Sequence, residues 1–185
     1  MKRSRVLLIG IAALLLIVAV AAFTTPEVEI HEDVRTLTAS KEIVWEVISD
    51  VPNYHNYATG LSGVTIISGE GKGMIRACSD ELGTWKETCT SWDEGSSYSF
   101  RVDTGTGFPY PFKKMIGTWS VYEIDENFSE IIVRFEYQFP YRWMHWFFND
   151  DTHKAFDEGD KTLLDNWEKA IAKAGILGEA WQGIY

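Results

Sequence analysis

The pattern of hydrophobic positions divides the chain at about residue 25. An uncharged, largely apolar run covers Val6 to Phe23 and follows three cations, Lys2, Arg3 and Arg5. A helix of that length reaches roughly 27 Å, about the thickness of a bilayer's hydrocarbon core. Residues 1–25 are therefore expected to form either an uncleaved transmembrane anchor or a signal segment. The small residues near Ala21 are compatible with signal cleavage.

The order of the cations and the apolar run also predicts a membrane topology. Positively charged residues that flank a hydrophobic segment usually stay in the cytoplasm. We therefore expect residues 26–185 to form one domain outside the cytoplasmic membrane, either tethered to the membrane as a single-pass protein or secreted after cleavage.

Downstream of residue 26, short runs with a two-residue period predict strands, and turn residues separate them. The expected strands are Val28–Thr38, Val64–Ser68, Met74–Ser79, Thr84–Trp92, Ser97–Asp103, Lys114–Asp125 and Glu130–Pro140. Two helical periods are also present. One follows Ser40, a good N-cap, and ends at Pro52; the other covers about Thr152 to Ala174, with Asp150 or Asp151 as its cap and Gly175 as its end.

The last predicted strand indicates how the sheet is packed. Its apolar residues alternate with polar ones, so one face is buried and the other is wet, as in antiparallel sheets. Strands and helices that are segregated in this way predict an α+β fold. We expect a curved, seven-stranded antiparallel sheet wrapped on a long amphipathic C-terminal helix.

Charge and cysteine content narrow the function. The 185-residue chain carries a net charge of −10, and no basic stripe with interleaved aromatic residues is present, so a nucleic acid partner is not expected. Cys78 and Cys89 fall on one face of a predicted hairpin, about 13 Å apart at the usual strand rise. A disulfide needs Cα atoms within about 7 Å, so two free thiols are expected.

Several segments of the chain resemble the START-like, or helix-grip, superfamily (SRPBCC), and specifically its polyketide cyclase/dehydrase and lipid-transport branch. The resemblance lies in the segment from Thr38 to Asp50 with the following Asn53-Tyr54, in Gly83-Thr84-Trp85-Lys86-Glu87 with Trp92 and Gly95, in Gly117-Thr118-Trp119, and in the closing helix Leu163–Ala174. It implies a helix-grip fold over about residues 28–174 and a hydrophobic ligand held between sheet and helix. The family shares no single catalytic motif, so the resemblance implies little about chemistry.

If the cavity exists, the aromatic residues of the second half are its expected lining. The predicted ligand-binding residues are Trp85, Phe100, Trp119, Phe135, Tyr137, Gly159 and Leu163. Gly159 lies on the apolar side of the last helix, where a glycine costs about 1 kcal/mol relative to alanine. A side chain at this position would fill the cavity; the alternative is a tolerated surface glycine among acidic neighbours.

No catalytic motif is evident. Glu87, Tyr137 and His55 are weak acid–base candidates. For Glu87 the simpler interpretation is an exposed residue paired with Arg76 or Arg101, and for His55 it is a surface loop. No histidine pair has metal-ligand spacing, and neither a metal nor a cofactor is expected. The leading hypothesis is a membrane-tethered or exported carrier of a hydrophobic small molecule or lipid. The alternatives are a cyclase or dehydratase acting on a polyketide-like substrate, and a tethered interaction domain with a filled core.

Overall fold

The computed structural model describes residues 9–11, 13, 16, 18, 20, 25–105 and 107–182, with side chains up to residue 175. The apolar run Val6–Phe23, on which the anchor and signal expectation rests, lies largely outside these residues. Among the described residues, no helix is both long enough and apolar enough to cross a membrane.

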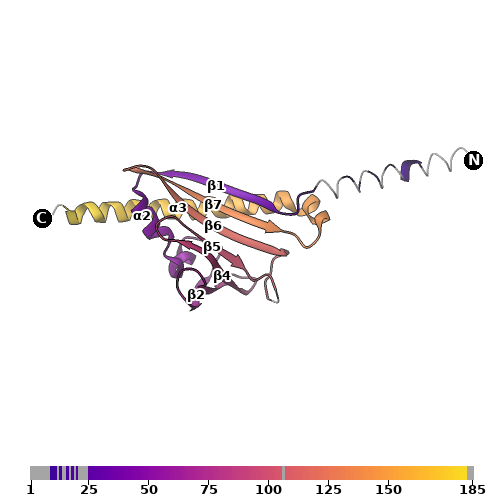
Figure 1. Ribbon diagram of the computed structural model, residues 1–185, viewed down its shortest axis with the longest axis horizontal. Helices are drawn as coiled ribbons and strands as arrows, with labels where there is room; N and C mark the ends of the chain where they lie inside the picture. Colours follow the sequence, from indigo (N-terminus) through magenta and orange to yellow (C-terminus); the bar gives the residue numbers. More distant parts are fainter. Residues whose placement is uncertain are drawn as a thin grey trace, which may run out of the picture.

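A seven-stranded antiparallel sheet forms the body of the molecule (Figure 1). Its strands are β1 (Glu29–Leu37), β2 (Gly63–Ser68), β3 (Ile75–Ser79), β4 (Thr84–Asp93), β5 (Ser97–Val102), β6 (Lys114–Asp125) and β7 (Phe128–Gln138). The spatial order β1-β7-β6-β5-β4-β3-β2 places the first two strands at opposite edges of the sheet. The alternation of apolar residues therefore predicted all seven strands to within about two residues of their ends.

The helices cover one face of this sheet. They are α2 (Lys41–Ile48), the 3-10 turns η1 (Val51–Asn56) and η2 (Arg142–Met144), and the long α3 (His145–Gln182). Figure 1 shows α3 running along the sheet, with η2 and the start of α3 at the end of the molecule where the described N-terminal residues leave. The apolar stripe of α3 packs inward as predicted, since Leu163, Leu164, Trp167 and Ile171 are buried.

The predicted limits of the last helix were wrong at both ends. It begins at His145, so Asp150 and Asp151 lie inside it and cap nothing, and it continues past Gly175 to Gln182. A glycine inside a helix costs only about 1 kcal/mol, which the flanking alanine, isoleucine and leucine residues can offset through their helix propensity. Gly175 therefore does not end the helix.

The predicted hairpin is formed by β3 and β4, where Cys78 pairs with Trp85 and Ser79 with Thr84. Both cysteines are buried free thiols. Burial raises the pKa of the Cys78 thiol to about 12, and the nearby Glu87 carboxylate adds to the effect.

One glycine shapes the sheet beneath the helix. A Cβ at Gly117 would lie 2.6 Å from the ring of Trp119 and 3.0 Å from that of Phe135. Any other residue would carry a Cβ that collides with these two rings. Glycine at position 117 therefore lets both rings pack against the backbone in the middle of β6. This position forms part of the cavity floor described next.

Candidate ligand-binding site

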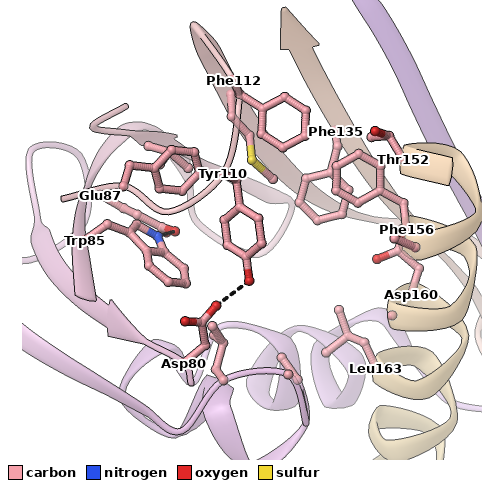
Figure 2. Close-up of a pocket in the computed structure, with 18 of the residues that line it drawn as sticks. Asp80, Trp85, Glu87, Tyr110, Phe112, Phe135, Thr152, Phe156, Asp160 and Leu163 are labelled. Atoms are coloured by element: carbon pink, nitrogen blue, oxygen red, sulfur yellow. Dashed lines mark hydrogen bonds between the residues drawn. The ribbon is translucent and has the colours of Figure 1, made fainter. Parts of the chain in front are cut away.

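A cavity of about 480 Å³ lies between the sheet and α3 (Figure 2). A volume in this range is typical of sites for small molecules. Its wall is mostly apolar and comes from η1 and the following loop, the β3–β4 turn, strands β4 to β7, the β5–β6 loop, and α3. The lining includes Trp85, Phe108, Tyr110, Phe112, Met115, Phe135, Phe148, Phe156 and Leu163.

A second hollow of about 160 Å³ continues the first toward the sheet. The two share Tyr54, Trp85, Glu87 and Phe135 among their lining residues, and the deeper one adds Phe100, Trp119 and Arg76. Together they form one site with a broad outer chamber and a narrow deep end.

One face of α3 supplies the helical wall. Phe156, Gly159, Asp160 and Leu163 have the i, i+3, i+4, i+7 spacing that places side chains on one side of a helix. A Cβ built on Gly159 meets nothing within 4 Å. Gly159 is exposed and borders the outer chamber, so it has features of both alternatives that the sequence left open, and it is not packed against protein.

A buried ion pair lies at the deep end. Arg76 is 1 % exposed, and its Nε donates to Glu87 Oε2 at 2.8 Å while Nη2 lies 2.6 Å from the same oxygen. The other Glu87 oxygen accepts a 2.8 Å hydrogen bond from Trp85 Nε1. Burial lowers the pKa of Arg76, but the Glu87 carboxylate, together with smaller contributions from Cys78, Tyr54 and Tyr98, raises the pKa above its ordinary value. The guanidinium carbon also lies 3.9 Å from the centroid of the Phe100 ring.

This arrangement corrects the simpler interpretation of Glu87. Arg76 is its partner, as that interpretation proposed, but Glu87 is only 7 % exposed and lines both hollows. Because both carboxylate oxygens already accept hydrogen bonds, Glu87 is poorly placed to take a proton from a substrate.

Two N–H donors at the deep end remain available. Among the described residues, Arg76 Nη1 and Trp119 Nε1 are buried without a hydrogen-bond partner. A buried donor without a partner costs roughly 1–3 kcal/mol. A ligand oxygen in the deep end could accept from such donors and recover part of that cost.

Asp160 is a site residue that the sequence analysis missed. It is 4 % exposed and lines the outer chamber, and Figure 2 shows it on the helical wall near Phe156. Burial raises the pKa of Asp160 to about 8, with repulsion from Asp33 and Asp157 adding to the effect. The chamber therefore has a carboxyl group that holds its proton near neutral pH.

Behind Asp160, charged residues of β1 and α3 form a compact cluster. His31 Nε2 lies 3.3 Å from Asp160 Oδ2 and 3.2 Å from Asp33 Oδ2, and His31 Nδ1 lies 3.1 Å from His153 Nδ1. One ligand atom each from His31, Asp33 and Asp157 lies within 4.8 Å of the others. The sequence analysis, which expected no metal, did not foresee this grouping because His31 and Asp33 lie more than 120 positions before Asp157 and Asp160.

The mouth of the outer chamber has its own polar contact. Tyr110 donates a hydrogen bond to Asp80, as Figure 2 shows, and so links the β5–β6 loop to the β3–β4 turn. Burial raises the pKa of Tyr110 to about 12, and the Asp80 carboxylate contributes. Hydrogen bonds from Tyr110 and from the amides of Leu82 and Gly83 outweigh burial and lower the pKa of Asp80.

Six of the seven predicted ligand-binding residues line this site. Trp85, Phe135, Gly159 and Leu163 border the outer chamber, and Phe100 and Trp119 border the deep end.

Tyr137 borders neither: it is fully buried, donates a 2.7 Å hydrogen bond to Asn149 Oδ1, and contacts the rings of Phe112 and Phe156. His55 lies in η1, also outside both walls. Neither is positioned for acid–base chemistry in the cavity.

The comparison with protein families agrees with this geometry. The family model described as "Polyketide cyclase / dehydrase and lipid transport" matches residues 29–172. The chain belongs to this family. The match covers every strand of the sheet and most of α3, so the resemblance inferred from the sequence is confirmed.

Solved structures show the same helix-grip fold at low sequence identity. The protein TTHA0849 from Thermus thermophilus is 17% identical, with a TM-score of 0.64 over 79% of this chain and 99% of that one. The Zhui aromatase/cyclase from Streptomyces sp. R1128 is 17% identical, with a TM-score of 0.59 over 80% and 94%. Norcoclaurine synthase from Thalictrum flavum, solved with dopamine and hydroxybenzaldehyde, is 15% identical, with a TM-score of 0.63 over 82% and 91%. No curated protein sequence matches the chain.

Proposed function

We propose that this protein is a carrier, tethered to the outer face of the cytoplasmic membrane or exported, that binds a hydrophobic small molecule or lipid between the sheet and α3. The cavity of about 480 Å³ is the observation that carries the proposal. A tethered interaction domain with a filled core, the third hypothesis, does not agree with a cavity of this size.

The polar groups of the site suggest what the ligand carries. The walls favour an apolar body, whereas Arg76 Nη1 and Trp119 Nε1 are donors without acceptors at the deep end. We therefore expect a largely apolar molecule with an oxygen acceptor at one end, such as a carboxylate, carbonyl or phenol oxygen.

Native mass spectrometry of the full chain after gentle detergent extraction tests the proposal. We expect a bound apolar molecule that dissociates at raised collision energy, and saturable binding of a fluorescent fatty acid to the emptied protein. A chain that carries no ligand and binds the probe without saturation would contradict the carrier function.

The location outside the cytoplasm has a separate test. Protease added to intact cells, or to spheroplasts where an outer membrane is present, is expected to digest residues 26–185. Complete protection of this domain after access has been opened would contradict export.

An enzyme of the cyclase or dehydratase type is the second candidate, and Asp160 is the observation that favours it. A carboxyl group that keeps its proton near pH 7 inside a cavity can act as a general acid. If this function holds, Asp160→Asn is expected to abolish turnover of a polyketide-like substrate while leaving its binding nearly unchanged. A variant that keeps full turnover would exclude Asp160 as the acid.

A further inference from the structure

Five exposed aromatic side chains gather at the start of α3. We call them the aromatic patch: Tyr141, Trp143, Trp146, Phe147 and Phe148, whose exposed fractions run from 42% to 69%. Trp143 contacts both Tyr141 and Phe147, with ring centroids 6.2 Å apart in each pair. A cluster of large exposed apolar side chains is uncommon on a protein that faces only water, and it marks a contact surface.

The chain that leads to the apolar run is fastened to the same end of the molecule. Trp146 Nε1 donates a 2.9 Å hydrogen bond to Thr25 Oγ1. Gln138 Nε2 donates to Glu27 Oε1 at 2.9 Å, and His145 Nδ1 lies 3.2 Å from Glu29 Oε1. Residues 25–29 therefore leave the domain beside the patch, as Figure 1 shows for the start of α3.

The chain length sets the depth of the patch relative to a bilayer. Thr25 is two residues after Phe23, the last residue of the apolar run, so the two are at most about 7 Å apart along the chain. The headgroup region of one leaflet is roughly 5–8 Å thick. If the run spans the hydrocarbon core, Trp146 lies at the level of the headgroups, where tryptophan and tyrosine are enriched in membrane proteins.

We propose that the aromatic patch is a membrane-docking surface that lies among the lipid headgroups and turns the cavity mouth toward the bilayer. The proposal rests on the tethered form of the proposed function. Phe148 belongs to the patch and also lines the outer chamber, so the patch is continuous with the cavity. A lipid that leaves the bilayer at the patch would enter the chamber without crossing bulk water.

The net charge of the protein indicates that aromatic side chains, and not attraction to anionic lipids, make the membrane contact. With a net charge of −10, the protein gains little from anionic lipids. Docking by aromatic side chains is therefore expected on purely zwitterionic phosphatidylcholine and is expected to change little with ionic strength.

The test uses the full chain reconstituted into phosphatidylcholine vesicles, with an environment-sensitive NBD fluorophore at one position. Phe147→Cys places it in the patch, at a side chain that is 69% exposed. Ile124→Cys is the matched control: it is 55% exposed and lies near the β6–β7 turn. The start of β7, just after this turn, pairs with the far end of β1 at Leu37. The nine residues of β1 separate the two ends by about 30 Å. Cys78 and Cys89 are buried and are not expected to react.

We expect blue-shifted emission at position 147 and several-fold stronger quenching by spin-labelled lipid than at position 124. Equal, water-like emission at both positions would overturn the proposal. A blue shift at 147 without lipid quenching would also overturn it, because the patch would then contact another protein or a second copy of this chain. Recovery of the chain outside the vesicle fraction would refute the tether, yet fatty acid binding in detergent would still report the carrier function independently.

Discussion

Replacing Gly159 with leucine tests where the ligand lies, because this position lines the outer chamber and has no neighbour within 4 Å of an added Cβ. The four carbons of the leucine side chain occupy roughly 100 Å³ at protein packing density. That is about a fifth of the 480 Å³ chamber. We expect the substituted protein to fold, because the new side chain enters empty space.

The expected loss of affinity follows from the volume removed. A ligand that fills the chamber would have to withdraw about four methylene groups, each worth about 0.8 kcal/mol when buried. The total, about 3 kcal/mol, corresponds to a rise in Kd of roughly 100-fold. Stability is expected to move in the opposite direction, rising by somewhat under 1 kcal/mol, because leucine is a better helix former than glycine.

Titration with a fluorescent fatty acid measures the affinity, and urea unfolding measures the stability. Two controls separate space from helix propensity. Gly159→Ala should give a similar gain in stability with little loss of affinity. Gly175→Leu, on the same helix but outside the cavity wall, should leave affinity unchanged. If Gly159→Leu binds the probe as tightly as the natural protein, the ligand does not occupy this chamber.

Three further predictions concern stability and reactivity. Glu87→Gln leaves the buried Arg76 charge without its carboxylate, and we expect it to lower the free energy of unfolding in urea by about 3–5 kcal/mol. Arg76→Met combined with Glu87→Met removes both charges, so its free energy of unfolding should lie closer to that of the natural protein. Equal losses in the two variants would contradict this. The raised pKa of Asp160 means that the folded state holds a proton which the unfolded state releases, so stability should fall by up to about 5 kcal/mol between pH 4 and 8. Asp160→Asn should flatten this decline, and an unchanged pH profile would show that Asp160 is not its source. Cys78 and Cys89 should react with a maleimide only after unfolding, and rapid labelling of the native protein would contradict their burial.

The fold could be predicted from the sequence because local pattern and tertiary packing agree along most of the chain. In β7 the inward residues Ile131 and Val133 are both fully buried, as their alternation with polar neighbours indicated. The start of α3 could not be placed in the same way. The segment from His145 to Asp151 has aromatic and acidic residues all round, so it shows no helical period.

The apolar part of the site was predictable and its charged part was not. Trp85 and Phe135 follow from strand alternation, since inward rings on a curved sheet must face either a core or a cavity. The burial of Arg76 and Asp160 in the site was not predicted, because charged residues are normally expected in solvent. Their positions carried a signal nonetheless: Arg76 lies two residues before the buried Cys78, on the same face of β3, and Asp160 lies three residues before Leu163 on the apolar stripe.

Tyr137 shows the limit of alternation as a guide. It points to the inner side of the sheet, as predicted, but Phe112 and Phe156 pack against its ring and close that end of the cavity. Both contacts join segments far apart in the sequence, and the strand pattern of β7 contains no information about them.

Photochemical labelling inside the cavity tests the central claim most directly. The full chain is equilibrated with a fatty acid that carries a diazirine on its alkyl tail, irradiated, and mapped by peptide mass spectrometry. The account predicts adducts on the β5–β6 loop around 108–112 and on α3 around 155–163, with both reduced in Gly159→Leu. Adducts confined to the exterior of the domain, and unchanged in that variant, would contradict a ligand site between the sheet and α3.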